Sequence, residues 1–95
     1  MKHCILVKWN KSVNDKNRIA EEVQNLFNNL LKLNGIHEVK IIKNVVDREN
    51  RYDLLIRIDL EKEILPVYDE SETHHDWKKK YGKFVENKAI FDYEG

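Results

Sequence analysis

The stretch Tyr52-Asp-Leu-Leu-Ile-Arg-Ile-Asp-Leu60 alternates apolar and polar side chains more regularly than any other part of the chain. Every second residue from Tyr52 to Leu60 is apolar, and Asp53, Arg57 and Asp59 lie between them. Successive side chains of a β-strand point to opposite faces, so this pattern predicts a strand with one face on a core. The segments around it must then supply the partner strands.

Three further segments have the composition of strands. A strand is predicted over about residues 37–46, and the polar stretch Asp47-Arg48-Glu49-Asn50 is typical of a hairpin connection to the strand at 52–60. The nearly continuous apolar run from His3 to Trp9 is typical of a strand that is covered on both faces. The last strand is predicted over about residues 84–93, where one face carries Val85, Ala89, Phe91 and Tyr93.

An amphipathic helix is predicted between the first two strands. Ser12, with Asp15 three residues later, resembles a capping box, and Asn14 is an alternative cap. Asn34-Gly35 is expected to end the helix, because both residues tolerate a left-handed backbone. The apolar stripe that faces the core consists of Ile19, Val23, Leu26, Phe27, Leu30 and Leu31.

The segment before the last strand is predicted to be helical but broken. Pro66 has no backbone N–H to donate and fits the first turn of a short helix over Leu65 to Glu70. Ser71 is the expected cap of a further helix over His74 to Tyr81, which Gly82 ends.

The order β-α-β-β-α-β predicts one α+β domain, residues 1–95, with a ferredoxin-like antiparallel sheet and helices on one face. An isolated domain would leave the other sheet face in water, and an apolar patch of that size usually marks an interface. We therefore expect a homodimer, a dimeric α/β barrel closed by two sheets. The residues that indicate apolar side chains on both faces are Ile5, Val7, Ile42, Val46, Leu55 and Ile90.

Charge and composition argue against several classes of function. Seventeen Lys and Arg residues balance seventeen Asp and Glu residues, whereas nucleic-acid binders normally carry a basic excess. No apolar stretch approaches the roughly 20 residues that span a bilayer. A single Cys4, in an apolar run, cannot form an intramolecular disulfide. With no signal-peptide layout at the N-terminus, we expect a cytoplasmic protein that binds neither nucleic acid nor membranes.

Several short motifs, taken in order, resemble the stress-responsive A/B barrel (Dabb) family. The opening His3-Cys-Ile-Leu-Val-Lys-Trp9 is similar to the HxxxxKW/F start of that family. Tyr68, followed six residues later by His74, is similar to its YxxHPxH segment. The remaining matches, which extend the resemblance over nearly the whole chain, are Gly35-Ile36, Asn44-Val45-Val46, Arg51-Tyr52-Asp53-Leu54 and Ile90-Phe91-Asp92-Tyr93-Glu94.

This resemblance implies a dimeric barrel in which the C-terminal strand helps to join the subunits. One plant member of the family is an enzyme that folds a linear polyketide acid by aldol condensation, and its catalytic tyrosine and histidine match Tyr68 and His74. Ser71 replaces the first histidine of the YxxHPxH segment, and Leu54 stands where that enzyme has a pocket histidine. Other members carry the same tyrosine and histidine without an established activity.

Tyr68 and His74 are the candidate catalytic pair. His74 would act as a general base and Tyr68 as the hydrogen-bond donor that stabilises an enolate, without any cofactor. The alternative is structural, with both side chains bonded to free backbone groups where the broken helix meets the sheet. Further candidates for binding a ligand are His3, Trp9, Tyr52, His75 and Trp77. Trp77 and Tyr81, four residues apart, are expected above all to pack their helix on the sheet.

No metal site is expected, because the adjacent His74 and His75 would point about 100° apart on a helix and no HxxxH or CxxC spacing occurs. The leading hypothesis is a dimeric barrel that binds a small apolar or carbonyl-containing molecule. A cofactor-independent cyclase or lyase, a purely structural assembly module and a cofactor-free monooxygenase are the alternatives.

Overall fold

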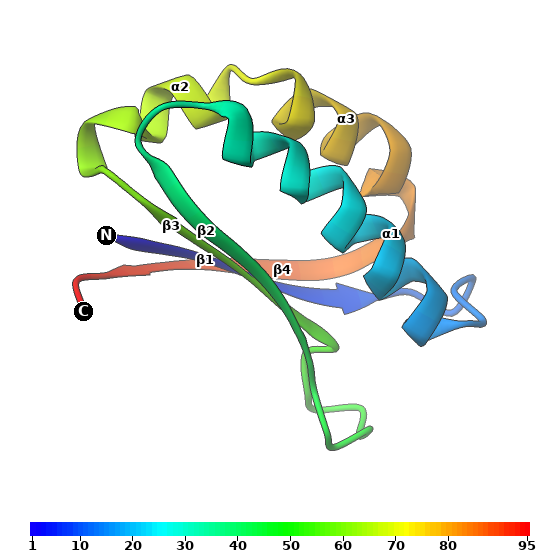
Figure 1. The fold of residues 1–95 in the computed structure, drawn as a ribbon. Helices are drawn as coiled ribbons and strands as arrows, with labels where there is room; N and C mark the ends of the chain where they lie inside the picture. Colours follow the sequence, from blue (N-terminus) through cyan, green and yellow to red (C-terminus); the bar gives the residue numbers. More distant parts are fainter.

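The computed structural model describes residues 1–95 (Figure 1). Four strands form one sheet: β1 (Lys2–Trp9), β2 (Ile36–Lys43), β3 (Leu54–Leu60) and β4 (Val85–Tyr93). The α-helices are α1 (Lys16–Asn28), α2 (Leu65–Asp69) and α3 (Glu72–Tyr81). Short 3₁₀ turns follow α1 (Asn29–Lys32), precede α2 (Lys62–Ile64) and follow α3 (Gly82–Phe84).

The sheet has the strand order β2-β3-β1-β4, and every neighbouring pair is antiparallel. All three α-helices lie on one face of this sheet, and the opposite face carries no helix (Figure 1). The two central strands, β1 and β3, are adjacent in the sheet although about fifty residues separate them in the sequence. The predicted ferredoxin-like α+β fold is therefore confirmed.

The core lies between the sheet and the helices. Alternate residues of β3 from Leu54 to Leu60 and of β1 from Ile5 to Trp9 are buried there with Val23 and Phe27 of α1. Removing each such side chain from water stabilises the fold by about 1.5–3 kcal/mol. Because strand alternation and the helical stripe agree, this single core specifies which face of the sheet the helices cover.

The helix ends explain where each helix sits. The Asp15 side chain accepts a hydrogen bond from the Arg18 N–H at 3.0 Å, so Asp15 is the N-cap of α1. Ser71 caps α3 as predicted, accepting the His74 N–H at 3.2 Å. Gly35 has φ +92°, and a Cβ there would collide with the Ile64 side chain, so only glycine fits this turn into β2.

The register shows on which face each of the residues lies that indicated apolar side chains on both sides of the sheet. Ile5 and Val7 pack under the helices, and Ile90, directly opposite Ile5 in β4, points to the same side. Val46 lies beyond the end of β2, in the connection to β3. The apolar run of β1 does not alternate with polar residues, so its sequence does not show which side chains face the helices. The pairing with β3 and β4 shows it.

The open face is nevertheless apolar across its centre. Residues directly opposite one another in neighbouring strands share a face. The register therefore makes one continuous row of Ile42, Leu55, Leu6 and Ala89 across all four strands. Beside this row, Phe91 stands opposite Cys4, and Tyr93 stands opposite Lys2.

Strand β2 ends three residues earlier than predicted because Asn44 closes the hairpin. Its side chain donates to the Tyr52 carbonyl at 2.8 Å and accepts from the Val46 N–H at 2.9 Å. The rest of the connection, 44–53, projects below the sheet (Figure 1).

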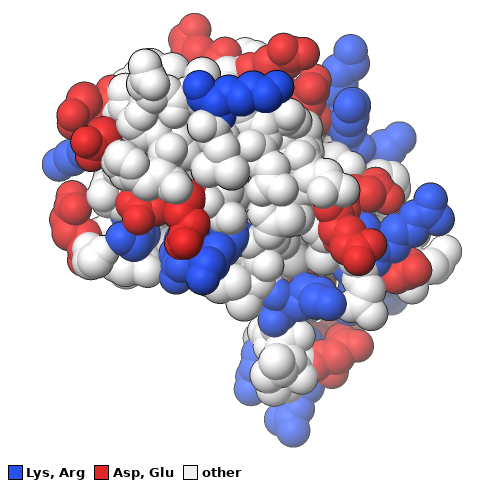
Figure 2. Space-filling model, in the orientation of Figure 1, with Lys and Arg blue, Asp and Glu red and all other residues white.

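Charged side chains of both signs are intermingled on the face seen in Figure 2, where no area is dominated by one sign. None of the helices combines the length and the apolar character needed to cross a membrane.

Candidate functional site

Three of the predicted site residues, His3, Tyr68 and His74, form an aromatic cluster between β1 and the α2–α3 junction. The Tyr68 ring centroid lies 5.4 Å from that of His3 and 4.9 Å from that of His74. Tyr68 is buried, with 1% of its surface exposed, and His3 is buried beside it. Residues from β1 and from the broken helical segment therefore lie in contact, which a single site containing His3, Tyr68 and His74 requires.

The break between α2 and α3 sets the positions of Tyr68 and His74. Pro66, in the first turn, starts α2. Ser71 ends it, because both its backbone N–H and its hydroxyl donate to the Tyr68 carbonyl, at 3.0 and 2.6 Å. The same hydroxyl then receives the His74 N–H. Ser71, which departs from the family motif, therefore holds the two candidate residues on consecutive helices.

The imidazole of His74 has a defined tautomer. Its Nδ1 lies 2.8 Å from the Asp69 carbonyl oxygen, which only accepts, so Nδ1 carries the proton and donates. Burial lowers the pKa of His74 below its ordinary value, although the bond to the Asp69 carbonyl opposes this effect. At neutral pH the ring is therefore uncharged, and its Nε2 has a free lone pair that can accept a proton.

The hydroxyl of Tyr68 is buried and has no hydrogen-bond partner. Burial, followed by the nearby negative charge of Asp69, raises the pKa of Tyr68 well above its ordinary value. The group is therefore a neutral O–H donor whose donor capacity is unused. A buried polar group without a partner is rare in folded proteins and is a feature that functional sites often show.

His3 is anchored from the other side by Asp92 of β4. Its Nδ1 lies 2.5 Å from the Asp92 carboxylate, and the two residues face each other in the β1–β4 register. Asp92 also lines a surface pocket of about 590 Å³ between the N-terminus and α2. This pocket is therefore separated from the cluster only by Asp92, which contacts His3.

Tyr68 and His74 line none of the pockets that open on the surface with volumes of 350 to 590 Å³. His74 bonds a backbone carbonyl, as the structural alternative expected, whereas Tyr68 does not. The arrangement offers a neutral base and an unused donor side by side.

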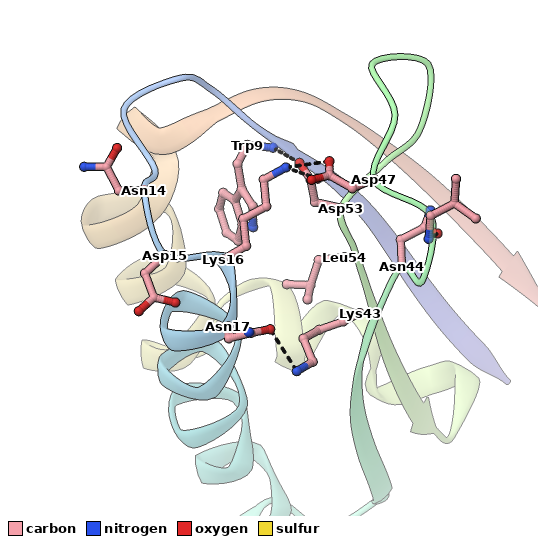
Figure 3. Close-up of a pocket in the computed structure, with 11 residues that line it drawn as sticks. Trp9, Asn14, Asp15, Lys16, Asn17, Lys43, Asn44, Asp47, Asp53 and Leu54 are labelled. Atoms are coloured by element: carbon pink, nitrogen blue, oxygen red, sulfur yellow. Dashed lines mark hydrogen bonds and ion pairs between the residues drawn. The ribbon is translucent and has the colours of Figure 1, made fainter.

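The structure places the other predicted ligand residues outside this cluster. His75 is exposed on α3, with its ring 6.4 Å from that of His74. Trp77 is a core residue that packs against Phe27, as the packing hypothesis for this side chain expected. Tyr52 precedes β3 at the opposite end of the sheet. Trp9 ends β1 at that same end and lines a separate pocket of about 430 Å³ (Figure 3).

Two residues that bear on these sites were not predicted from the sequence. Asp92 holds His3 across a separation of 89 residues, which only the strand register reveals. Asp53, read as an outward-facing strand residue, binds the Trp9 N–H at 2.8 Å and Lys16 at 3.0 Å. No group of three or more His, Cys, Asp or Glu side chains is arranged to hold a metal ion.

No protein-family model matches this chain, and no curated protein is similar to it in sequence. Solved structures do match. A dimeric ferredoxin-like protein of unknown function from Bacteroides fragilis is 18% identical, with a TM-score of 0.79 over 99% of this chain and 94% of that one. A hydroxynitrile lyase from Passiflora edulis is 12% identical, with a TM-score of 0.74 over 97% and 89% of the two chains.

A third match bears on the sequence resemblance. A Dabb family protein with a ferredoxin-like fold from Mesorhizobium loti has a TM-score of 0.70 over 99% of this chain and 94% of that one, at 9% identity. Identities this low establish the fold and leave function open. The chain therefore has the ferredoxin-like α+β fold that this Dabb protein, the lyase and the dimeric Bacteroides protein share.

Proposed function

We propose that this protein is a homodimer of the Dabb type that binds a small apolar or carbonyl-containing molecule beside Tyr68 and His74. The single observation that carries the binding proposal is the buried Tyr68 hydroxyl without a partner. A ligand oxygen that accepts this hydrogen bond would satisfy it.

The open sheet face supports the homodimer. Ile42 of the apolar row and the neighbouring Phe91 have 42% and 63% of their surfaces exposed. Four of the charged residues on this face already form two ion pairs, since Lys2 binds Asp59 at 3.2 Å and the Arg57–Glu38 pair has the same N–O distance. A second copy could therefore cover the row without leaving these charges unpaired, and a two-fold axis would let the same patch serve on both subunits.

The dimer is tested by light scattering. We expect twice the 11.4 kDa of one chain, or about 23 kDa. A monomer at micromolar concentration would contradict the dimeric proposal and would leave the apolar row unexplained.

The binding proposal is tested with acetophenone as the carbonyl probe and ethylbenzene as its match without an oxygen. In isothermal titration, acetophenone should bind the wild type about tenfold more tightly than it binds Tyr68→Phe, the size expected for one buried hydrogen bond. Ethylbenzene should not distinguish the two proteins. Tyr81→Phe is the matched control, because the Tyr81 hydroxyl binds Glu22 at 3.1 Å, away from the cluster.

Equal binding of acetophenone to wild type and Tyr68→Phe would remove Tyr68 from any ligand site. Failure of both probes to bind would instead favour the structural assembly module, in which the cluster only packs α2 and α3 against β1.

A cofactor-independent lyase or cyclase is the second candidate, and the His74 tautomer is the observation that favours it. A neutral imidazole with a free Nε2 can take a proton from the carbon beside a carbonyl or from the hydroxyl of a cyanohydrin, and the Tyr68 O–H can stabilise the resulting oxyanion. In a cyanohydrin the C–CN bond then breaks, and the cyanide leaves with the proton. A solved structure of the same fold is a hydroxynitrile lyase. Cleavage of mandelonitrile to benzaldehyde and cyanide, followed by absorbance, should fall at least about a hundredfold in His74→Gln. Turnover that persists in the variant would exclude His74 as the base.

A further inference from the structure

The pocket at the Trp9 end of β1 has no part in the proposed function. It occupies about 430 Å³ between the start of α1, the end of β2 and the start of β3. His3 and Trp9 are six residues apart on the same strand, or about 20 Å. The two sites are therefore separate, and the inference drawn here does not rest on the proposed function.

Trp9 supplies the first sign that the pocket is built for a ligand. The side chain is 4% exposed, yet its indole Nε1–H has no hydrogen-bond partner. In Figure 3 the ring nitrogen lies on the side of the indole that faces Lys16 and Leu54, among the residues that line the pocket. An indole nitrogen can only donate, so it requires an acceptor from the ligand.

The carboxylates of Asp47 and Asp53 in the pocket already have partners. The Asp53 carboxylate receives the Trp9 backbone N–H at 2.8 Å and the Lys16 ammonium at 3.0 Å. Lys16 also reaches Asp47 at 3.2 Å, and both interactions raise the pKa of Lys16 and keep it charged. The dashed lines of Figure 3 show this network above Leu54. Lys16 therefore holds both carboxylates and neutralises one of their two negative charges.

The groups that remain free are donors. Lys43 points to the Asn17 amide oxygen at 3.0 Å and has no carboxylate partner (Figure 3). That bond leaves the Asn17 NH₂ group unused. The first turn of the 13-residue helix α1 also borders the pocket and contains no acidic side chain, so the positive end of its dipole is offset only by the N-cap Asp15.

We propose that this pocket binds a small monocarboxylic acid, with its carboxylate at Trp9 Nε1 and Lys43 and its apolar body against Leu54 and Val46. Trp9, Lys43 and Asn17 all line the space and each carries an unused donor, and the volume suits a small organic molecule. Asp47 and Asp53 at the rim disfavour a multiply charged anion such as phosphate, because like charges repel. A carboxylate carries the single charge that the free cation can match.

The test uses benzoate as the carboxylate and benzamide as its neutral match of nearly the same shape. The protein has two indole N–H signals in a nitrogen–proton NMR spectrum, from Trp9 and Trp77. Benzoate should shift the Trp9 signal saturably and leave that of Trp77 nearly still, and benzamide should bind at least about tenfold more weakly. Inorganic phosphate at equal ionic strength should not compete with benzoate.

Variants then separate the two donors. Trp9→Phe keeps an aromatic ring and should weaken benzoate binding about tenfold, as the loss of one buried charge-assisted bond predicts. Lys43→Met should weaken it about fivefold, whereas Lys40→Met, on the opposite face of the same strand, should change nothing. Unchanged binding in Lys43→Met, equal affinity for benzamide, or no saturable shift up to about 10 mM benzoate, far above the affinity of a specific site, would overturn the proposal. Lys43 is exposed, so its variant stays informative even if Trp9→Phe does not fold.

Discussion

The two faces of the sheet differ in what covers them and therefore in what their side chains do. On the helix-covered face, alternate residues of β1 and β3 are buried within one chain. On the open face, the row from Ile42 to Ala89 and the neighbouring Phe91 have no cover in the single chain. Burial on the first face makes the monomer stable, whereas burial on the second requires another molecule. Substitutions on the two faces should therefore change different measurements.

The largest effect is expected on the covered face, in Ile56→Ala. Ile56 is fully buried at the centre of β3. Removing its side chain loses the transfer free energy and leaves a cavity, so the free energy of unfolding should fall by about 2–5 kcal/mol. Urea denaturation followed by circular dichroism measures this loss. An Ile56→Ala protein within about 0.5 kcal/mol of the wild type would mean that this face is not the packed core.

The next effect is expected on the open face, in Phe91→Asp. A charge in the centre of a closed sheet-to-sheet interface costs several kcal/mol, so the dimer should dissociate at micromolar concentration. Light scattering should show the single-chain mass, while circular dichroism still shows a folded protein. Val45→Asp is the matched control, because Val45 is an exposed apolar residue that lies in the hairpin connection, away from the row. A dimer that survives Phe91→Asp would place the interface elsewhere.

This comparison also shows what could be predicted from the sequence. The alternation of β3 correctly predicted which of its faces is buried. A strand has only two faces, and burying the other one would place Asp53, Arg57 and Asp59 in the core. The apolar run of β1 has no such period, so its pattern alone could not assign Ile5 and Val7 to a face. A strand with apolar residues on both sides takes its orientation from its neighbours.

The candidate site was predicted in the same uneven way. The spacing of Tyr68 and His74 is local, and Ser71 as a helix cap is a local signal too, so this part could be predicted from the sequence. The bond between His3 and Asp92 joins the two ends of the chain and depends on the β1–β4 register. No sequence pattern within β1 or β4 predicts this bond. For the same reason the Trp9 pocket, built from three distant segments, had no motif of its own.

A smaller effect, on the covered side, is expected in Tyr68→Phe. The apolar side chains buried on the helix-covered face stabilise the fold. The Tyr68 hydroxyl is an exception, because it is buried without a hydrogen-bond partner. Removing it should leave the free energy of unfolding unchanged or raise it by up to about 1 kcal/mol. In Tyr81→Phe, by contrast, the bond to Glu22 is lost, and the free energy of unfolding should fall by at most about 1 kcal/mol. A clear loss of stability in Tyr68→Phe would show that its hydroxyl has a partner within the fold.

The smallest effect on stability is expected from the charge of His74. This residue packs against Tyr68 on the helix-covered face but is only partly buried. In the unfolded chain an imidazole binds a proton near pH 6.5. The folded protein holds the pKa of His74 lower, chiefly through burial, so at pH values between the two the unfolded chain binds more protons. The free energy of unfolding must then rise with pH. This contribution is complete above about pH 6.5 and is lost as the pH falls through the folded pKa of His74.

His74→Gln isolates this dependence, because an amide can still donate to the Asp69 carbonyl but does not titrate. Urea midpoints of both proteins between pH 5 and pH 8 give the difference, in which the titration of the carboxylates cancels. We expect the wild type to lose stability relative to the variant below pH 6.5 and the two curves to run parallel above it. Parallel curves throughout would mean that His74 is as well hydrated as an unfolded imidazole. It would then belong to the exposed surface, and the neutral base on which the lyase hypothesis depends would lose its physical cause.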